Sequence, residues 1–66
     1  MTNIEDKIKE IAMATNELRN SEEPTLFYKE INSDIEYIKA RCHLEGLHTE
    51  ELLTLYSNKL YELKHV

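Results

Sequence analysis

Four side chains of the kinds that bind zinc lie close together in the chain: Cys42, His43, Glu45 and His48. A structural zinc site normally brings two paired sets of ligands, whereas this chain has a single cysteine. Cys42 also falls on a predicted apolar helix face, where a free cysteine behaves as a small hydrophobic residue. We therefore expect no metal and no cofactor, with Cys42 in the core and the other three side chains solvated at a turn. A contact with a partner at this turn is the alternative.

Two further arrangements could carry catalysis. Cys42 and His43 are a possible nucleophile and base, but adjacent helical residues point about 100° apart and do not readily hydrogen-bond to each other. Paired carboxylates need a pocket that separates their pKa values, and all three pairs here fall in predicted first turns, where the helix dipole favours acids. These pairs are Glu5/Asp6, Glu22/Glu23 and Glu50/Glu51. With one glycine, the chain has no glycine-rich phosphate loop. We expect that it is not an enzyme.

Four tyrosines are many for so short a chain: Tyr28, Tyr37, Tyr56 and Tyr61. A tyrosine buries an apolar ring while its hydroxyl stays wet, which suits half-buried and interface positions. Tyr28 and Tyr56 fall on the predicted core sides of their helices, and Tyr37 and Tyr61 fall off them. The latter two either pack at the solvent edge or contact a partner.

The elements that position these residues are predicted to be helices of a single domain spanning residues 1–66. Thr2 and Glu5 fit a capping box, and Pro24 suits the first turn of a second helix. Gly46 is placed to end that helix, and Thr49 to cap a third. No segment alternates with a period of two, so no strand is expected. The predicted fold is all-α, a small bundle of a short N-terminal helix and a long helical hairpin. Its helices span residues 3–19, 24–45 and 50–65.

The middle helix is predicted to be apolar on two opposed sides. One side has Phe27, Tyr28, Ile31, Ile35, Ile38 and Cys42, and the other has Leu26, Tyr37 and Leu44 with Ala40 beside them. A helix of this kind lies between two layers. Either the outer helices flank it, or its second side meets another chain. We favour self-association as a homodimer, because so small a core needs additional burial.

Size and charge narrow the function. The chain has 66 residues, with 13 acidic and 8 scattered basic side chains and a net charge of −5. Nucleic-acid binding needs clustered cations, so we expect no direct nucleic-acid contact. There is no apolar stretch long enough for a membrane span and no apolar region after Met1 typical of a signal peptide. With one cysteine, these features favour a cytoplasmic protein.

The stretch from Ile31 to Leu63 resembles the small aspartyl-phosphate phosphatases of sporulation signalling. Those proteins are acidic two-helix hairpins with a Ser-Gln-x-Leu-Asp signature in the second helix. The corresponding residues are Ser57-Asn58-Lys59-Leu60-Tyr61. Ser57 and Leu60 match, but Tyr61 replaces the aspartate on which the activity depends. The resemblance implies, as an alternative function, a phosphatase-like regulator of signalling.

The favoured hypothesis is a non-catalytic regulatory or inhibitory protein that binds a protein partner through an apolar helix face. Its predicted contact residues are Leu26, Tyr37, Leu44 and Tyr61. Besides the phosphatase-like regulator, an acidic DNA mimic that inhibits a DNA-binding protein is an alternative. A dimer with a purely structural role would bind no other partner.

Overall fold

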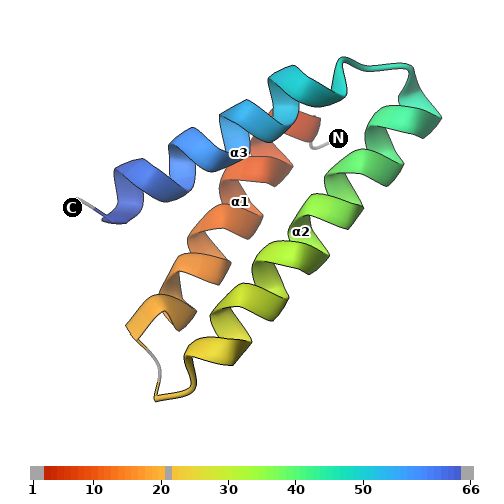
Figure 1. The fold of residues 1–66 in the computed structure, drawn as a ribbon. Coiled ribbons are helices and arrows are strands. Elements are labelled where there is room, and N and C mark those ends of the chain that lie inside the picture. The colour runs from red at the N-terminus through yellow and green to blue at the C-terminus, as the bar shows by residue number, and fades with distance from the viewer. Residues whose placement is uncertain (1–2, 21, 65–66) are drawn as a thin grey trace.

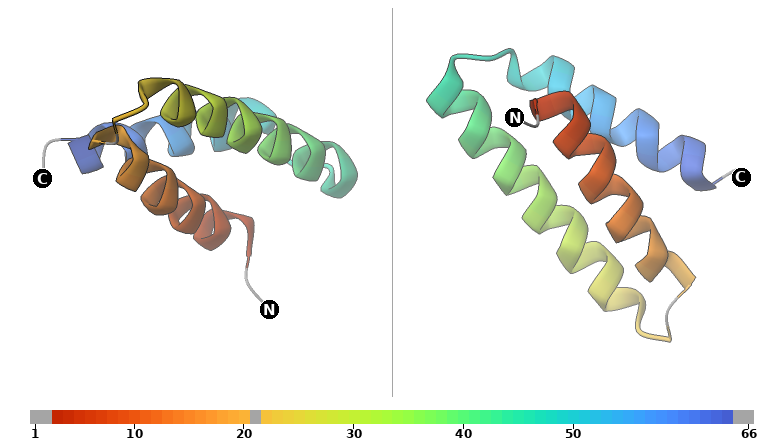
Figure 2. Two further views of the ribbon diagram at one scale, coloured as in Figure 1. Left: turned by 90° about the horizontal axis from the view of Figure 1, so that it is seen from below. Right: turned by 180° about the vertical axis from the view of Figure 1, so that it is seen from behind.

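The computed structural model describes residues 3–20 and 22–64, and these form a bundle of three α-helices (Figure 1). The elements are α1 (Ile4–Asn16), a 3-10 helix η1 (Glu17–Asn20), α2 (Pro24–Glu45) and α3 (Thr49–Lys64). Figures 1 and 2 show α1 and α2 side by side and antiparallel, with α3 turning back from the end of α2 at an angle to α1. Each helix contacts the other two. The predicted all-α, three-helix fold is confirmed.

The first helix is capped by a different residue from the one predicted. The Asn3 side chain accepts a hydrogen bond from the Asp6 backbone N–H at 2.9 Å, which satisfies an amide that lacks a partner within the helix. Thr2, the predicted cap, lies outside the described residues. At its other end α1 tightens into η1, so the predicted single helix over residues 3–19 is an α-helix followed by a 3-10 turn.

The second helix has the predicted bounds. Pro24 lies in its first turn, where a missing N–H costs nothing, and Glu23 precedes it without a side-chain capping bond. At the far end Gly46 has φ 67° and ψ 36°, the left-handed conformation that glycine adopts without strain. The Leu47 backbone N–H donates to the Cys42 carbonyl at 2.9 Å, which is the closing bond of a Schellman motif.

The third helix begins one residue earlier than predicted. Thr49 is its first helical residue rather than its cap, because the His48 carbonyl already accepts a bond from the Leu52 N–H at 3.2 Å. Within residues 3–20 and 22–64, no helix is both long enough and apolar enough to cross a lipid bilayer.

The core lies where the three helices meet. Its fully or nearly buried apolar members come from all three: Ile8, Ala12, Ile38, Cys42, Tyr56 and Leu60. Partly buried residues pack around them, and these are Ile4, Ile11, Ile31, Ile35, Leu52, Leu53, Leu55 and Leu63. The predicted core position of Cys42 is thus what the structure shows, with 1% of the residue exposed.

The buried side of α2 differs from the predicted one. Tyr28, expected in the core, is 64% exposed, whereas Asp34, which is not a member of the predicted apolar side, is only 6% exposed. The centre of the buried side is therefore turned by roughly 30° around the helix from its predicted position. Leu26, Tyr37 and Leu44 consequently lie on a flank of α2, roughly 110° from that centre, rather than on the opposite side. Neither α1 nor α3 covers this flank of α2, so the alternative in which the outer helices flank α2 on both sides is not what the structure shows.

Candidate functional site

Three of the four predicted contact residues form one line along the flank of α2, which we call the outer stripe. It consists of Leu26, Tyr37 and Leu44, with exposed fractions of 44%, 36% and 82%. Their spacing of eleven and seven residues brings each back to nearly the same angle around the helix. At 1.5 Å per residue the stripe is roughly 27 Å long. Large apolar side chains in an uncovered line on a small protein are typical of an interaction surface.

The positions between these three anchors are small or polar. Glu30, Ser33 and Ala40 are all exposed and complete a run in steps of four and three from Leu26 to Leu44. This is the spacing of a coiled-coil seam, in which successive residues face a neighbouring helix. The outer stripe therefore has the period needed to pack against one further helix.

Arg41 holds Tyr37, the middle residue of the outer stripe, in place. The Arg41 guanidinium donates from Nη1 to the Tyr37 hydroxyl at 3.1 Å and from Nε to the Glu45 carboxylate at 2.7 Å. Its Cζ atom also lies 5.9 Å from the centre of the Tyr37 ring. The bond to Glu45, and after it the bond to Tyr37, raises the pKa of Arg41 above its usual value. These contacts restrict the rotamers that the Tyr37 side chain can adopt.

The fourth predicted contact residue, Tyr61, is separate from the outer stripe. It lies on α3 and is 65% exposed. Arg19 links the region around Tyr61 to the first turn of α2. Its Nη2 atom donates to the carbonyl of Leu60, the neighbour of Tyr61, at 3.1 Å, and its guanidinium lies 4.8 Å from the ring centre of Phe27, the neighbour of Leu26. Tyr61 and Leu26 thus lie at the same end of the bundle but on different helices.

Sequence reasoning did not single out one exposed apolar residue in the turn after α2. This residue is Leu47, which is 37% exposed. Because the left-handed Gly46 ends the helix before it, the helical spacing of the stripe does not continue to Leu47, and no periodic signal in the sequence marked it. Met13 and Tyr28 are also exposed, on other faces.

A buried polar cluster connecting the three helices was also missed. One carboxylate oxygen of Asp34, Oδ2, accepts hydrogen bonds from the Thr15 hydroxyl at 2.5 Å and from the Tyr56 hydroxyl at 2.6 Å. Thr15 and Tyr56 are each 1% exposed. Burial, followed by the hydrogen bond to Asp34, raises the pKa of Tyr56 well above its usual value. Closed to solvent, this cluster fixes the relative positions of α1, α2 and α3 and offers no opening to a substrate.

The residues first considered for metal binding are not brought together. Cys42 is buried, whereas His43, Glu45 and His48 are exposed, and Glu45 pairs with Arg41. Among the described residues, no three His, Cys, Asp or Glu side chains converge on a point that could hold an ion. Of the phosphatase-like segment, Leu60 is buried in the core while Ser57 and Tyr61 face outward.

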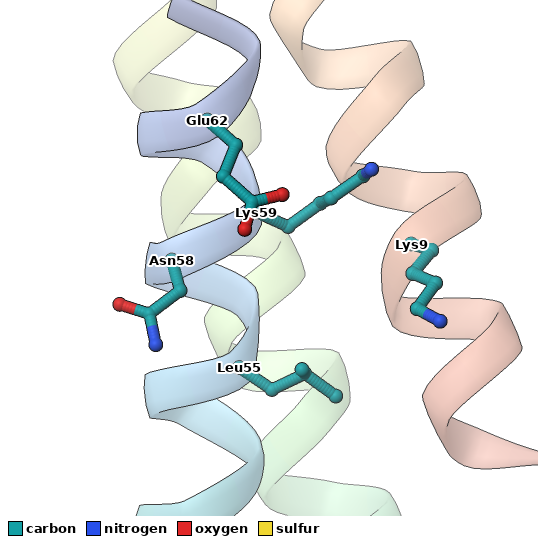
Figure 3. Close-up of a pocket in the computed structure, with 5 residues that line it drawn as sticks. All are labelled: Lys9, Leu55, Asn58, Lys59 and Glu62. Atoms are coloured by element: carbon teal, nitrogen blue, oxygen red, sulfur yellow. The ribbon is translucent and has the colours of Figure 1, made fainter.

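A hollow of about 290 Å³ lies between α1 and α3 (Figure 3). Leu55 forms its apolar part, and its polar lining consists of Lys9 from α1 and Asn58, Lys59 and Glu62 from α3. Its charges are of both signs and come from flexible surface side chains. No single ligand chemistry is selected by such a lining.

Comparison with known proteins adds no relative: no protein-family model, curated protein or solved structure matches this chain.

Proposed function

We propose that this chain is a small regulatory or inhibitory protein that acts without catalysis, by docking the outer stripe of α2 onto a helix of another protein. The observation that carries the proposal is the uncovered line of Leu26, Tyr37 and Leu44, which is exposed although the remainder of the bundle has two other helices available to cover it.

The energy for docking comes from the three anchors. Fully burying a leucine-sized side chain stabilises by about 1.5–3 kcal/mol, so covering three partly exposed anchors supplies several kcal/mol. Tyr37 is held by Arg41 before binding, and a pre-oriented aromatic side chain is the usual centre of an interface hot spot.

Charge indicates the kind of partner helix. Glu30 and Glu36 are exposed on or beside the stripe, and the whole chain has a net charge of −5. The rim of the stripe carries both signs, because Lys29 and Arg41 flank it as well as Glu36. The attraction for a partner with basic side chains therefore comes from the net charge of the whole chain, and it accelerates association. The expected partner surface is therefore an amphipathic helix with lysine or arginine at its edges.

The test is affinity capture from the source organism with tagged protein, comparing wild type with Tyr37→Asp. The matched control is Asn32→Asp, which adds the same charge to an exposed position of the same helix, roughly 140° away from Tyr37. We expect a protein that is enriched by wild type and by Asn32→Asp and is depleted at least tenfold with Tyr37→Asp. Equal enrichment by all three proteins would contradict the proposal. Circular dichroism of each variant checks that the helices are intact.

A further inference from the structure

We infer that the outer stripe also pairs with the outer stripe of a second copy of this chain, α2 against α2 in antiparallel orientation. The inference rests on the proposed function, because both use the outer stripe. A second copy and a partner helix therefore compete for this surface. The monomer is the form that binds the partner. The argument uses the spacing, the side-chain sizes and the charges along α2.

The run from Leu26 through Glu30, Ser33, Tyr37 and Ala40 to Leu44 is symmetric in its spacing about position 35. In an antiparallel pair of helices related by a two-fold axis at that level, residues equally distant from it face each other. Leu26 then meets Leu44 of the second copy at both ends of the interface. The intervening layers place Glu30 beside Ala40 and Ser33 beside Tyr37. Every position of the run from Leu26 to Leu44 has a counterpart from the same run.

The sizes of the facing side chains complement one another. The large ring of Tyr37 faces the small Ser33, and the long side chain of Glu30 faces the small Ala40. Alternation of large and small residues across facing positions lets two helix surfaces interdigitate. Leucine faces leucine only at the two ends, where these anchors are exposed in the single chain.

The charges favour the antiparallel orientation. Glu30 lies only one residue, or about 1.5 Å, along the axis from Arg41 of the second copy. Arg41 uses Nε and Nη1 for Glu45 and Tyr37, and a guanidinium carries five N–H donors, so it can also bind this carboxylate. A parallel pair in register would instead place Glu30 against Glu30 in the centre of the interface.

One pair opposes the dimer and gives it a tunable strength. The two copies of Glu36 approach each other beside the axis, because this position is adjacent to the centre of symmetry. Two carboxylates that face each other across a pair of helices repel and weaken the pair modestly. The replacement Glu36→Gln removes the repulsion and is expected to tighten the dimer about twofold, as measured by sedimentation equilibrium.

The orientation is tested by crosslinking purified protein. Leu26→Cys and Leu44→Cys chains are treated with a short bifunctional maleimide, separately and as a mixture, while the native Cys42 stays buried at 1% exposure. We expect a crosslinked dimer only in the mixture, because only unlike positions meet. A mixture of Leu26→Cys with Asn32→Cys is the control and should give no dimer.

Two results would overturn the inference. Crosslinks in the separate samples would show a parallel pair, and the absence of any crosslink, with a mass of 7.8 kDa in sedimentation up to millimolar concentration, would show that no pair forms. Neither result affects the capture experiment, which uses the chain with a partner. Conversely, a failed capture leaves the crosslink between purified chains unaffected, so the two proposals fail separately.

Tyr37→Asp should abolish the dimer, and Ala40→Asp provides a second such variant if Tyr37→Asp disturbs folding.

Discussion

Asp34 determines which side of α2 faces the core. Its carboxylate has two hydroxyl donors, Thr15 from α1 and Tyr56 from α3, and burying it without them would be costly. The position has core spacing, three residues after Ile31 and four before Ile38. Hydrophobic pattern alone assigns an acid to the surface. Only the two hydroxyl groups, far away in the sequence, make its burial favourable, and their convergence could not be predicted from one chain's periodicity.

The first prediction concerns this cluster. Asp34→Ala leaves the hydroxyl groups of Thr15 and Tyr56 buried without an acceptor, and the free energy of unfolding should fall by about 3 kcal/mol. Asp34→Asn keeps an acceptor oxygen and should cost about 1 kcal/mol. Urea unfolding followed by circular dichroism measures both. The outcome against this account is an Asp34→Ala protein as stable as wild type.

The second prediction concerns alkaline pH. Burial, and after it the bond to Asp34, raises the pKa of Tyr56, so the folded protein keeps this phenol protonated while the unfolded chain loses the proton at about pH 10. The resulting stability is complete below that pH and is lost as the pH rises toward the folded-state pKa. Urea unfolding should therefore show stability falling above about pH 10. Tyr56→Phe should fall less steeply, and identical slopes for the two proteins would contradict the assignment.

At the scale of the elements, local signals predicted the helices well. Pro24 and Gly46 bound α2 because each acts through its own backbone, without help from distant residues. The N-terminal cap was assigned one residue too early, since Thr2 and Asn3 are both good capping residues and only geometry separates them. The rotation of α2 was missed for a different reason. Which way a helix turns depends on its neighbours, and the sequence pattern leaves a range of roughly 30° open.

The third prediction concerns the end of α2. In Gly46→Ala a side chain must adopt φ 67°, and the free energy of unfolding should fall by about 1 kcal/mol. Crowding does not add to the cost, because an added Cβ atom meets nothing within 4 Å. Gly46→Asn is the matched variant and should cost less, since asparagine tolerates this conformation. Thermal unfolding compares the three proteins, and equal losses for alanine and asparagine would show that the backbone conformation is not the cause.

At the scale of the whole molecule, the bundle covers one side of its longest helix and leaves the outer stripe uncovered. The residues of the stripe could be found from spacing, and the structure places three of them in line. What covers these residues could not be deduced, because neither α1 nor α3 lies over them in the described part of the chain. A core built from so few residues supplies only a few kcal/mol of net stability, so any covering of the stripe adds a large fraction of the total.

The last prediction concerns the stability that is added when the outer stripe is covered. Leu44 is 82% exposed, so Leu44→Asp in the dilute monomer should change the free energy of unfolding by no more than about 0.5 kcal/mol. Ile38 is fully buried, so the control variant Ile38→Asp should prevent folding. Because a second copy binds only the folded state, the urea midpoint of wild type should rise with protein concentration, and that of Leu44→Asp should not. Unfolding curves at micromolar and near-millimolar protein measure this difference. If Leu44→Asp is unfolded even when dilute, Leu44 belongs to the core of the single chain, and the outer stripe is not a surface for binding.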